Sequence, residues 1–131
     1  MMTPADSGAA GLAILLWASE PEAPHRLATP FFVAAAAAAL DLPVEVYFTA
    51  RSVGLLAPGV AESLKASAHP KTILDAMREA VTHGAVFYAC NDALAAHGLG
   101  SATLIPECAR RGGVVQFMDR AGDLRWRTLV F

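Results

Sequence analysis

The sequence contains little cysteine, little charge and no apolar run of membrane-spanning length. Only 2 of its 131 residues are cysteine, and 17% are charged. Two thiols are too few for the disulfide scaffold of a small secreted domain. The longest apolar stretches, residues 8–18 and 31–40, are shorter than the roughly 20 residues that a transmembrane helix needs. We therefore expect neither a disulfide framework nor membrane insertion.

Basic residues are missing from the start of the chain. Asp6 is present there, and no lysine or arginine precedes Arg26, so the basic region of a secretory signal is lacking. This pattern predicts a cytoplasmic protein. In that compartment Cys90 and Cys108 stay reduced unless they react.

Several binding functions lack the motifs or the charge that they need. A formal net charge of −2 provides no electrostatic footprint for nucleic acid. No Gly-x-Gly-x-x-Gly follows the first apolar run, and neither a Walker-type Gly-Lys-Ser/Thr nor a Gly-x-Ser-x-Gly motif occurs, which disfavours nucleotide binding and nucleophile-elbow hydrolysis. The four histidines show no His-x3-His spacing and there is no Cys-x2-Cys, so we predict no metal site.

Half of the ten basic residues are arginines in the last part of the chain: Arg110, Arg111, Arg120, Arg125 and Arg127. A solvated basic face is the ordinary interpretation of such a cluster. A docking surface for an acidic partner or an anion is the alternative.

Apolar runs alternate with helical patterns along the first hundred residues. We expect a flexible tail over residues 1–10 and a single domain over 11–131, whose composition is 55% hydrophobic. Strands are predicted at 12–17, 44–48 and 85–89. Helices are predicted at 31–40, from 70 to 82, and briefly before His97-Gly98. Thr29-Pro30 predicts the start of the first helix, as N-cap and N1 proline, and Asn91 or Asp92 the cap of the short one.

The last thirty residues are more ambiguous. Residues 104–106 predict a short strand and 124–131 a final one. Residues 114–121 fit either a helix, with Val114, Phe117, Met118 and Ala121 inward, or one arm of a hairpin. We favour the helix because it continues the alternation of strands and helices.

This alternation predicts an α/β fold, a three-layer sandwich with parallel strand pairing. The six consecutive alanines at 34–39 give the first helix no polar face. Such a helix is covered on more than one side, either within the fold or in an oligomer interface.

Cys90 is the candidate for chemistry. It follows the strand at 85–89 and precedes a short helix, at the carboxyl end of a parallel strand, where α/β folds place ligands. Unpaired backbone N–H groups and the positive end of a helix dipole stabilise a thiolate, the reactive form, at such a position. His25, in the loop after the first strand, is expected at the rim of the site. Cys108 is either a structural thiol or a second, resolving one.

The chain resembles the DsrE/DsrF-like family over nearly all residues after 10. The likeness rests on the apolar first strand, the alanine-rich helix, Val46-Tyr47-Phe48-Thr49 followed by Gly54-Leu55-Leu56, residues 84–90 reading GAVFYAC, and residues 116–131. It implies a five-stranded, mainly parallel α/β/α fold and assembly into trimers or hexamers. In the sulfur-relay members it implies a persulfide carried on the cysteine that matches Cys90.

Three functional hypotheses follow. In the first, the protein is a sulfurtransferase or sulfur carrier: Cys90 accepts a sulfane sulfur from a donor protein or molecule, Asn91 and Asp92 contribute backbone N–H groups, and no cofactor or metal is needed. In the second, it is a non-catalytic oligomeric protein that binds a small ligand or a partner near the strand ends. In the third, Cys90 and Cys108 form a thiol-based switch.

Overall fold

The chain forms a five-stranded parallel sheet flanked by helices. The computed structural model describes residues 10–68 and 70–131, so residues 1–9 of the predicted tail and His69 lie outside the described part. The sheet order is β4-β3-β2-β1-β5, and every neighbouring pair is parallel. The strands are β1 (Gly11–Leu16), β2 (Val44–Phe48), β3 (Val86–Ala89), β4 (Arg110–Arg111) and β5 (Trp126–Val130). The α-helices are α1 (Ala28–Ala39), α2 (Ile73–Thr82), α3 (Asn91–Ala96) and α4 (Val114–Ala121), and the 3-10 helices are η1 (Pro24–Arg26), η2 (Ala50–Leu56) and η3 (Ala61–Ser63).

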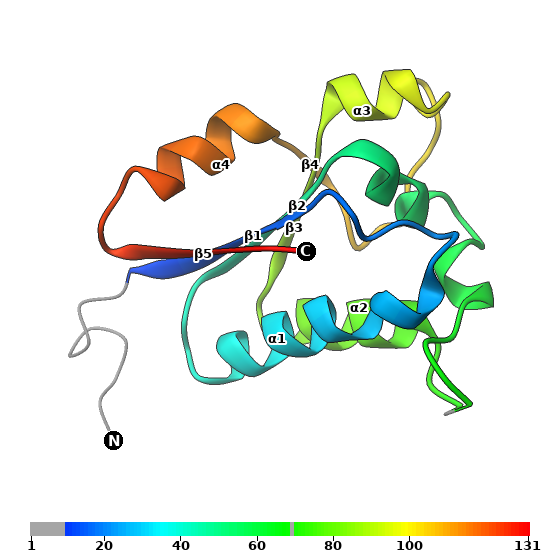
Figure 1. Cartoon of the computed structure of the whole chain (residues 1–131), viewed down its shortest axis with the longest axis horizontal. Coiled ribbons are helices and arrows are strands. Elements are labelled where there is room, and N and C mark those ends of the chain that lie inside the picture. Colours follow the sequence, from blue (N-terminus) through cyan, green and yellow to red (C-terminus); the bar gives the residue numbers. More distant parts are fainter. Residues whose placement is uncertain (1–9, 69) are drawn as a thin grey trace.

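Helices cover both faces of the sheet. Figure 1 shows α1 and α2 side by side on one face and α4 on the other, with α3 on the α4 side at the end of β3. The predicted three-layer sandwich with a parallel five-stranded sheet is confirmed. In the described part of the chain, no helix is long and apolar enough to cross a membrane.

Two hydrophobic clusters occupy the two faces of the sheet. The larger cluster, on the side of α1 and α2, includes the fully buried Ile14, Phe31 and Phe48. The smaller cluster, on the side of α4, is formed by Ala13, Tyr47, Tyr88 and Phe117. Neighbouring residues of β1 thus enter opposite clusters, as the pleat of a strand requires. Because both faces of β1 are buried, its sequence is a continuous apolar run.

The first helix begins two residues before the predicted N1 proline. Its N-cap is Leu27, with no side-chain hydrogen bond, so Thr29 is not the cap. The 3-10 helix η1 runs directly into α1, since the Leu27 N–H donates to the Pro24 carbonyl at 3.1 Å. Pro30 fits inside the first turn because an N–H at that position has no intrahelical acceptor.

The alanine-rich helix α1 is covered on two sides within the fold. It packs against β1 and β2 and also against α2. Phe31, Ala34 and Ala38 are buried, whereas Phe32 and the C-cap residue Leu40 are 47% and 61% exposed. Small alanine side chains let α1 approach both neighbours, and one side of the helix stays open to solvent.

The second helix begins at Ile73 rather than at Pro70. Thr72 and Asp75 form a capping box: the Asp75 N–H donates to Thr72 Oγ1 at 3.1 Å, and the Thr72 N–H donates to Asp75 Oδ2 at 2.9 Å. This reciprocal pair defines the helix start more strongly than the upstream proline does. As predicted, the helix ends before Gly84, which takes a left-handed φ of +118°.

The predicted strand at 104–106 is wrong, and the fourth strand is Arg110–Arg111. Ile105 is buried, but its N–H donates to the Leu56 carbonyl of η2 at 2.9 Å instead of joining the sheet. The edge of β3 is taken by the two arginines, in the register Tyr88↔Arg110. Both arginines are exposed, so no alternation of apolar residues marks this strand.

Residues 114–121 form the predicted helix, but its inward face differs from the prediction. Only Phe117 is buried, whereas Val114 and Met118 are 49% and 57% exposed. The helix turns a different face inward than predicted because polar side chains of β2 lie beneath it. Gln116 and Arg120 flank Phe117 on the inward side and bond to polar atoms of β2.

Candidate functional site

Cys90 joins β3 to α3 at the carboxyl end of the sheet. Its N–H donates to the Phe48 carbonyl of β2 at 3.0 Å, and its carbonyl accepts from the Leu94 N–H at 3.0 Å. Cys90 is therefore itself the N-cap of α3, and the predicted caps Asn91 and Asp92 are the first two helical residues. The extended backbone of Cys90 lets its carbonyl accept the first helical bond, and this decides the start of the helix. The thiol is half-buried and free of disulfide bonding.

A pocket of about 350 Å³ opens beside Cys90. Cys90, Asn91 and Asp92 lie together in its wall. The opposite wall comes from a segment about twenty residues further along the chain, residues 111–115, which links β4 to the first turn of α4. No residue of this second wall was predicted from the sequence to belong to the site.

The β3–β4 pairing places the second wall. Arg111 pairs with Ala89, and the Gly112 N–H donates to the Ala89 carbonyl at 3.1 Å. Gly113 follows as the N-cap of α4, and a Cβ atom on it would lie 3.2 Å from Cys90 Sγ. The Gly-Gly pair before a helix is the sequence signal that could have indicated this close approach.

The first turns of two helices line the pocket beside Cys90. Neither α3 nor α4 has a side-chain hydrogen bond at its N-cap. First-turn N–H groups have no intrahelical acceptor, and the positive end of the helix dipole attracts negative charge. The exposed Arg111 guanidinium adds a positive group to the wall, while the exposed Asp92 adds a negative one. The wall of the pocket therefore carries one charged side chain of each sign beside the first turns of two helices.

Comparison with known proteins agrees with the resemblance seen in the sequence. The sequence model of the DsrE/DsrF-like family matches residues 13–131. This chain belongs to the DsrE/DsrF-like family. The crystal structure of the YchN protein from E. coli is similar in fold, with a TM-score of 0.71 over 92% of this chain and 99% of that chain, at 13% sequence identity. No curated protein matches the sequence.

In this DsrE/DsrF-like chain a polar cluster holds α4 on the sheet. Arg120 donates from Nε to Glu45 Oε1 at 2.9 Å and from Nη2 to Glu45 Oε2 at 3.1 Å. The Tyr47 hydroxyl donates to Glu45 Oε1 at 2.7 Å and accepts from Gln116 Nε2 at 2.9 Å. The Arg120 guanidinium also stacks 4.4 Å from the centroid of the Trp126 ring. These contacts fix the helix whose first turn forms the second wall of the Cys90 pocket.

Hydrogen bonds keep Glu45 and Arg120 charged in this cluster, while Tyr47 stays protonated. Burial alone would raise the pKa of Glu45, but the hydrogen bonds from Arg120 and Tyr47 outweigh it and lower that pKa. Burial and the hydrogen bond to Glu45 raise the pKa of Tyr47.

Arg120 does not belong to a solvated basic face as predicted, because it is partly buried and paired with Glu45. The other four arginines of that group are exposed.

Cys108 lies in the core rather than in the pocket. Its side chain is 3% exposed, and Sγ lies 3.6 Å from the Phe87 carbonyl and 3.7 Å from the Arg110 carbonyl, where a thiol proton can be donated. Burial raises the pKa of this thiol. Its surroundings thus favour the protonated, unreactive form.

His25 does not line the Cys90 pocket. It lies in η1 and is exposed. A different pocket, of about 340 Å³, lies between the loop after β1, η2 and the end of α3, and is lined by Glu22, Arg51 and His97 among others. Within residues 10–68 and 70–131, no three His, Cys, Asp or Glu side chains gather as a metal site would require.

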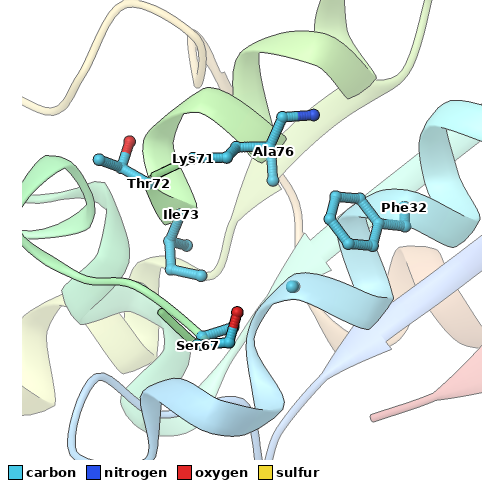
Figure 2. A pocket seen from close by; sticks show the side chains of 8 residues that line it. Phe32, Ser67, Lys71, Thr72, Ile73 and Ala76 are labelled. Atoms are coloured by element: carbon cyan, nitrogen blue, oxygen red, sulfur yellow. The ribbon is translucent and has the colours of Figure 1, made fainter. Parts of the chain in front are cut away.

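A third pocket, of about 360 Å³, lies between the first turns of α1 and α2. Figure 2 shows Phe32 of α1 across this space from Ile73 of α2, with Ser67 at its edge. The Lys71 ammonium group lies 5.4 Å from the centroid of the Phe32 ring and pairs with Glu79. Among the residues that the structure describes, the lining of this pocket includes neither a cysteine nor a histidine.

Proposed function

We propose that this protein handles sulfur, as a sulfurtransferase or sulfur carrier that accepts a persulfide on Cys90. The observation that carries the proposal is the half-buried Cys90 thiol at the carboxyl end of β3, in a pocket lined by the first turns of α3 and α4. Membership of the DsrE/DsrF-like family supports it, because the family is related to sulfur relay.

The proposed reaction is thiol–persulfide exchange. The Cys90 thiolate attacks the outer sulfur of a donor R–S–SH. A new S–S bond forms at Cys90 Sγ, the S–S bond of the donor breaks, and R–S⁻ leaves with the electron pair. In the second step an acceptor thiolate attacks the same outer sulfur, and Cys90 leaves as a thiolate. No external oxidant is needed, since the oxidation level travels with the sulfur atom.

The chain supplies the groups that hold the anion. Asn91 and Asp92 are the first two residues of α3, where backbone N–H groups have no helical acceptor. Arg111, on the opposite wall, attracts an anionic donor or the bound persulfide. His25 has no part in this mechanism because it does not line the pocket. The exchange itself requires neither a metal nor an organic cofactor.

Intact mass measurement tests the proposal. We expect the wild-type protein, after incubation with thiosulfate or polysulfide, to gain one sulfur atom that a reductant removes. Cys90→Ser should gain none, and Cys108→Ser, the matched control, should behave like wild type. A wild-type protein that gains no sulfur, although Cys90 still reacts with iodoacetamide, would refute the proposal and favour a binding function. Loss of two hydrogens under mild oxidation would indicate a switch between the two cysteines instead.

We also propose that the protein assembles into trimers or hexamers. Apolar side chains are exposed on α4 and on the edge strand β5: Val114, Val115, Met118, Leu129 and Val130. Exposed apolar groups gathered on neighbouring elements mark association surfaces. The mechanism needs a reduced thiol, so we place the protein in the cytoplasm, with a thiol-bearing donor and acceptor as its further partners.

A further inference from the structure

The backbone conformation of Gly113, which lies next to Cys90, does not explain why this residue is a glycine. Its φ of −132° and ψ of −150° are extended, a conformation open to any residue. Helix capping does not require glycine here either, because Ser, Thr, Asp or Asn is also a preferred N-cap residue and would accept a hydrogen bond from the first turn. Two ordinary reasons for glycine therefore do not apply at this position.

Space beside the thiol is the reason that remains. A Cβ atom at position 113 would lie 3.2 Å from Cys90 Sγ and 3.6 Å from Cys90 Cβ. The optimal separation of non-bonded heavy atoms is about 3.5–4.0 Å, so a methyl group would press on the sulfur. A persulfide needs still more room, because its outer sulfur lies about 2.05 Å beyond Sγ.

The neighbouring Gly112 has a different role. A Cβ atom there would lie 2.9 Å from Tyr88 Cδ1 and 2.8 Å from Gln116 Oε1, which are both atoms of the folded scaffold. Gly112 therefore lets the turn close onto β3 and α4. At Gly113, by contrast, the three nearest atoms all belong to Cys90.

We infer that Gly113 is a specificity-determining residue of the sulfur site: the missing side chain leaves the space that the outer sulfur atom of a Cys90 persulfide occupies. This inference rests on the proposed function. During exchange the outer sulfur lies between Cys90 Sγ and the sulfur of the donor or acceptor, so this space must also let that second sulfur approach. A larger residue at position 113 would leave the Cys90 thiol in place but crowd its persulfide, and so slow the exchange.

The test compares alanine at two glycines of the same segment. We expect Gly113→Ala to slow sulfur uptake from polysulfide by about tenfold, measured by intact mass against time, since overpacking at this scale changes a rate by that order. Gly122→Ala is the matched control. Its added methyl group meets the Met118 carbonyl oxygen at 3.5 Å, an ordinary contact at the other end of α4, and uptake should stay within about twofold of wild type.

Two further measurements separate a steric effect from a loss of structure or of ionisation. Gly113→Ser should be slowed similarly, although its hydroxyl can cap α4 and support the fold. The ultraviolet absorbance of the thiolate, taken as the difference from Cys90→Ser, should keep its wild-type pH dependence in Gly113→Ala. A matching loss of that absorbance would overturn the steric assignment.

The outcomes distinguish this inference from the proposed function. Slow uptake by both Gly113 variants, with normal uptake by wild type and Gly122→Ala, supports the inference. Wild-type rates in Gly113→Ala would overturn it and leave the sulfur function in place. No uptake by wild type would overturn the sulfur function and the role of Gly113 together.

Discussion

Replacing Arg120 by alanine should destabilise the protein by about 2 kcal/mol. Glu45 is 9% exposed, and Arg120 donates to both of its oxygens, at 2.9 and 3.1 Å. Removing one partner of a buried ion pair costs about 3–5 kcal/mol. The Arg120 side chain is 32% exposed, so water can partly replace it, and we take about 2 kcal/mol as the cost. At about 2.1 cal/mol/K of unfolding entropy per residue, this lowers the melting temperature by about 7 °C.

Thermal unfolding at several pH values is the assay. Burial opposes ionisation of Glu45, but hydrogen bonds from Arg120 and Tyr47 lower its pKa in the folded protein below 4.5. A lowered pKa stabilises the fold above that reference value, and the contribution disappears as the pH falls through the folded pKa. The gap between wild type and Arg120→Ala should therefore be complete at neutral pH and narrow as the pH falls below 4.5.

The matched control is Arg125→Ala. Arg125 pairs with Asp123 at 3.5 Å, with 71% and 34% of the two side chains exposed. An exposed pair contributes less than about 1 kcal/mol, so this variant should melt close to wild type at every pH above the titration of Asp123. Equal melting temperatures for the two arginine variants, or a gap that does not change with pH, would refute the role assigned to Arg120.

Three other properties can be predicted from the same structure. Iodoacetamide at neutral pH should modify Cys90 at least about tenfold faster than Cys108, because burial raises the pKa of the Cys108 thiol; peptide mass mapping gives both rates, and equal rates would contradict this. Phe117→Ala should lower the free energy of unfolding in urea by about 3 kcal/mol, since Phe117 is 6% exposed, and a loss below about 1 kcal/mol would show that α4 is held by its polar contacts alone. Val115 is 87% exposed, so Val115→Asp should leave each subunit folded, with little change in melting temperature, but reduce the oligomer mass measured by light scattering. An unchanged mass would place the subunit contact away from α4.

The buried strands and the major helices could be predicted because their own residues carry the pattern. Residues 44–48 are buried throughout in the structure, and an apolar, β-branched run is typical of such a strand. The amphipathic stripe of α2 was equally direct. Arg110–Arg111 could not be predicted, because an exposed edge strand of two arginines is defined by its partner β3 and not by its own side chains.

The inward face of α4 shows the same limit. Its sequence fits a helix, and the structure has one. The choice between an apolar face with Met118 and a mixed face with Arg120 depends on what lies beneath the helix. Glu45 and Tyr47 lie there, and a buried carboxylate requires a partner. That requirement comes from β2, about seventy residues earlier, so no local pattern could reveal it.

The sequence by itself determined the class of fold, the family and the position of Cys90 at the end of a strand, because alternating apolar runs and a strand-to-helix junction are local features. The tertiary structure alone decided what surrounds Cys90. Gly113 lies next to the Cys90 thiol because β4 pairs with β3. Cys108 lies outside the Cys90 pocket because it is buried in the core. Pairing and burial depend on residues far apart in the chain, so the wall of the pocket had to be seen in three dimensions.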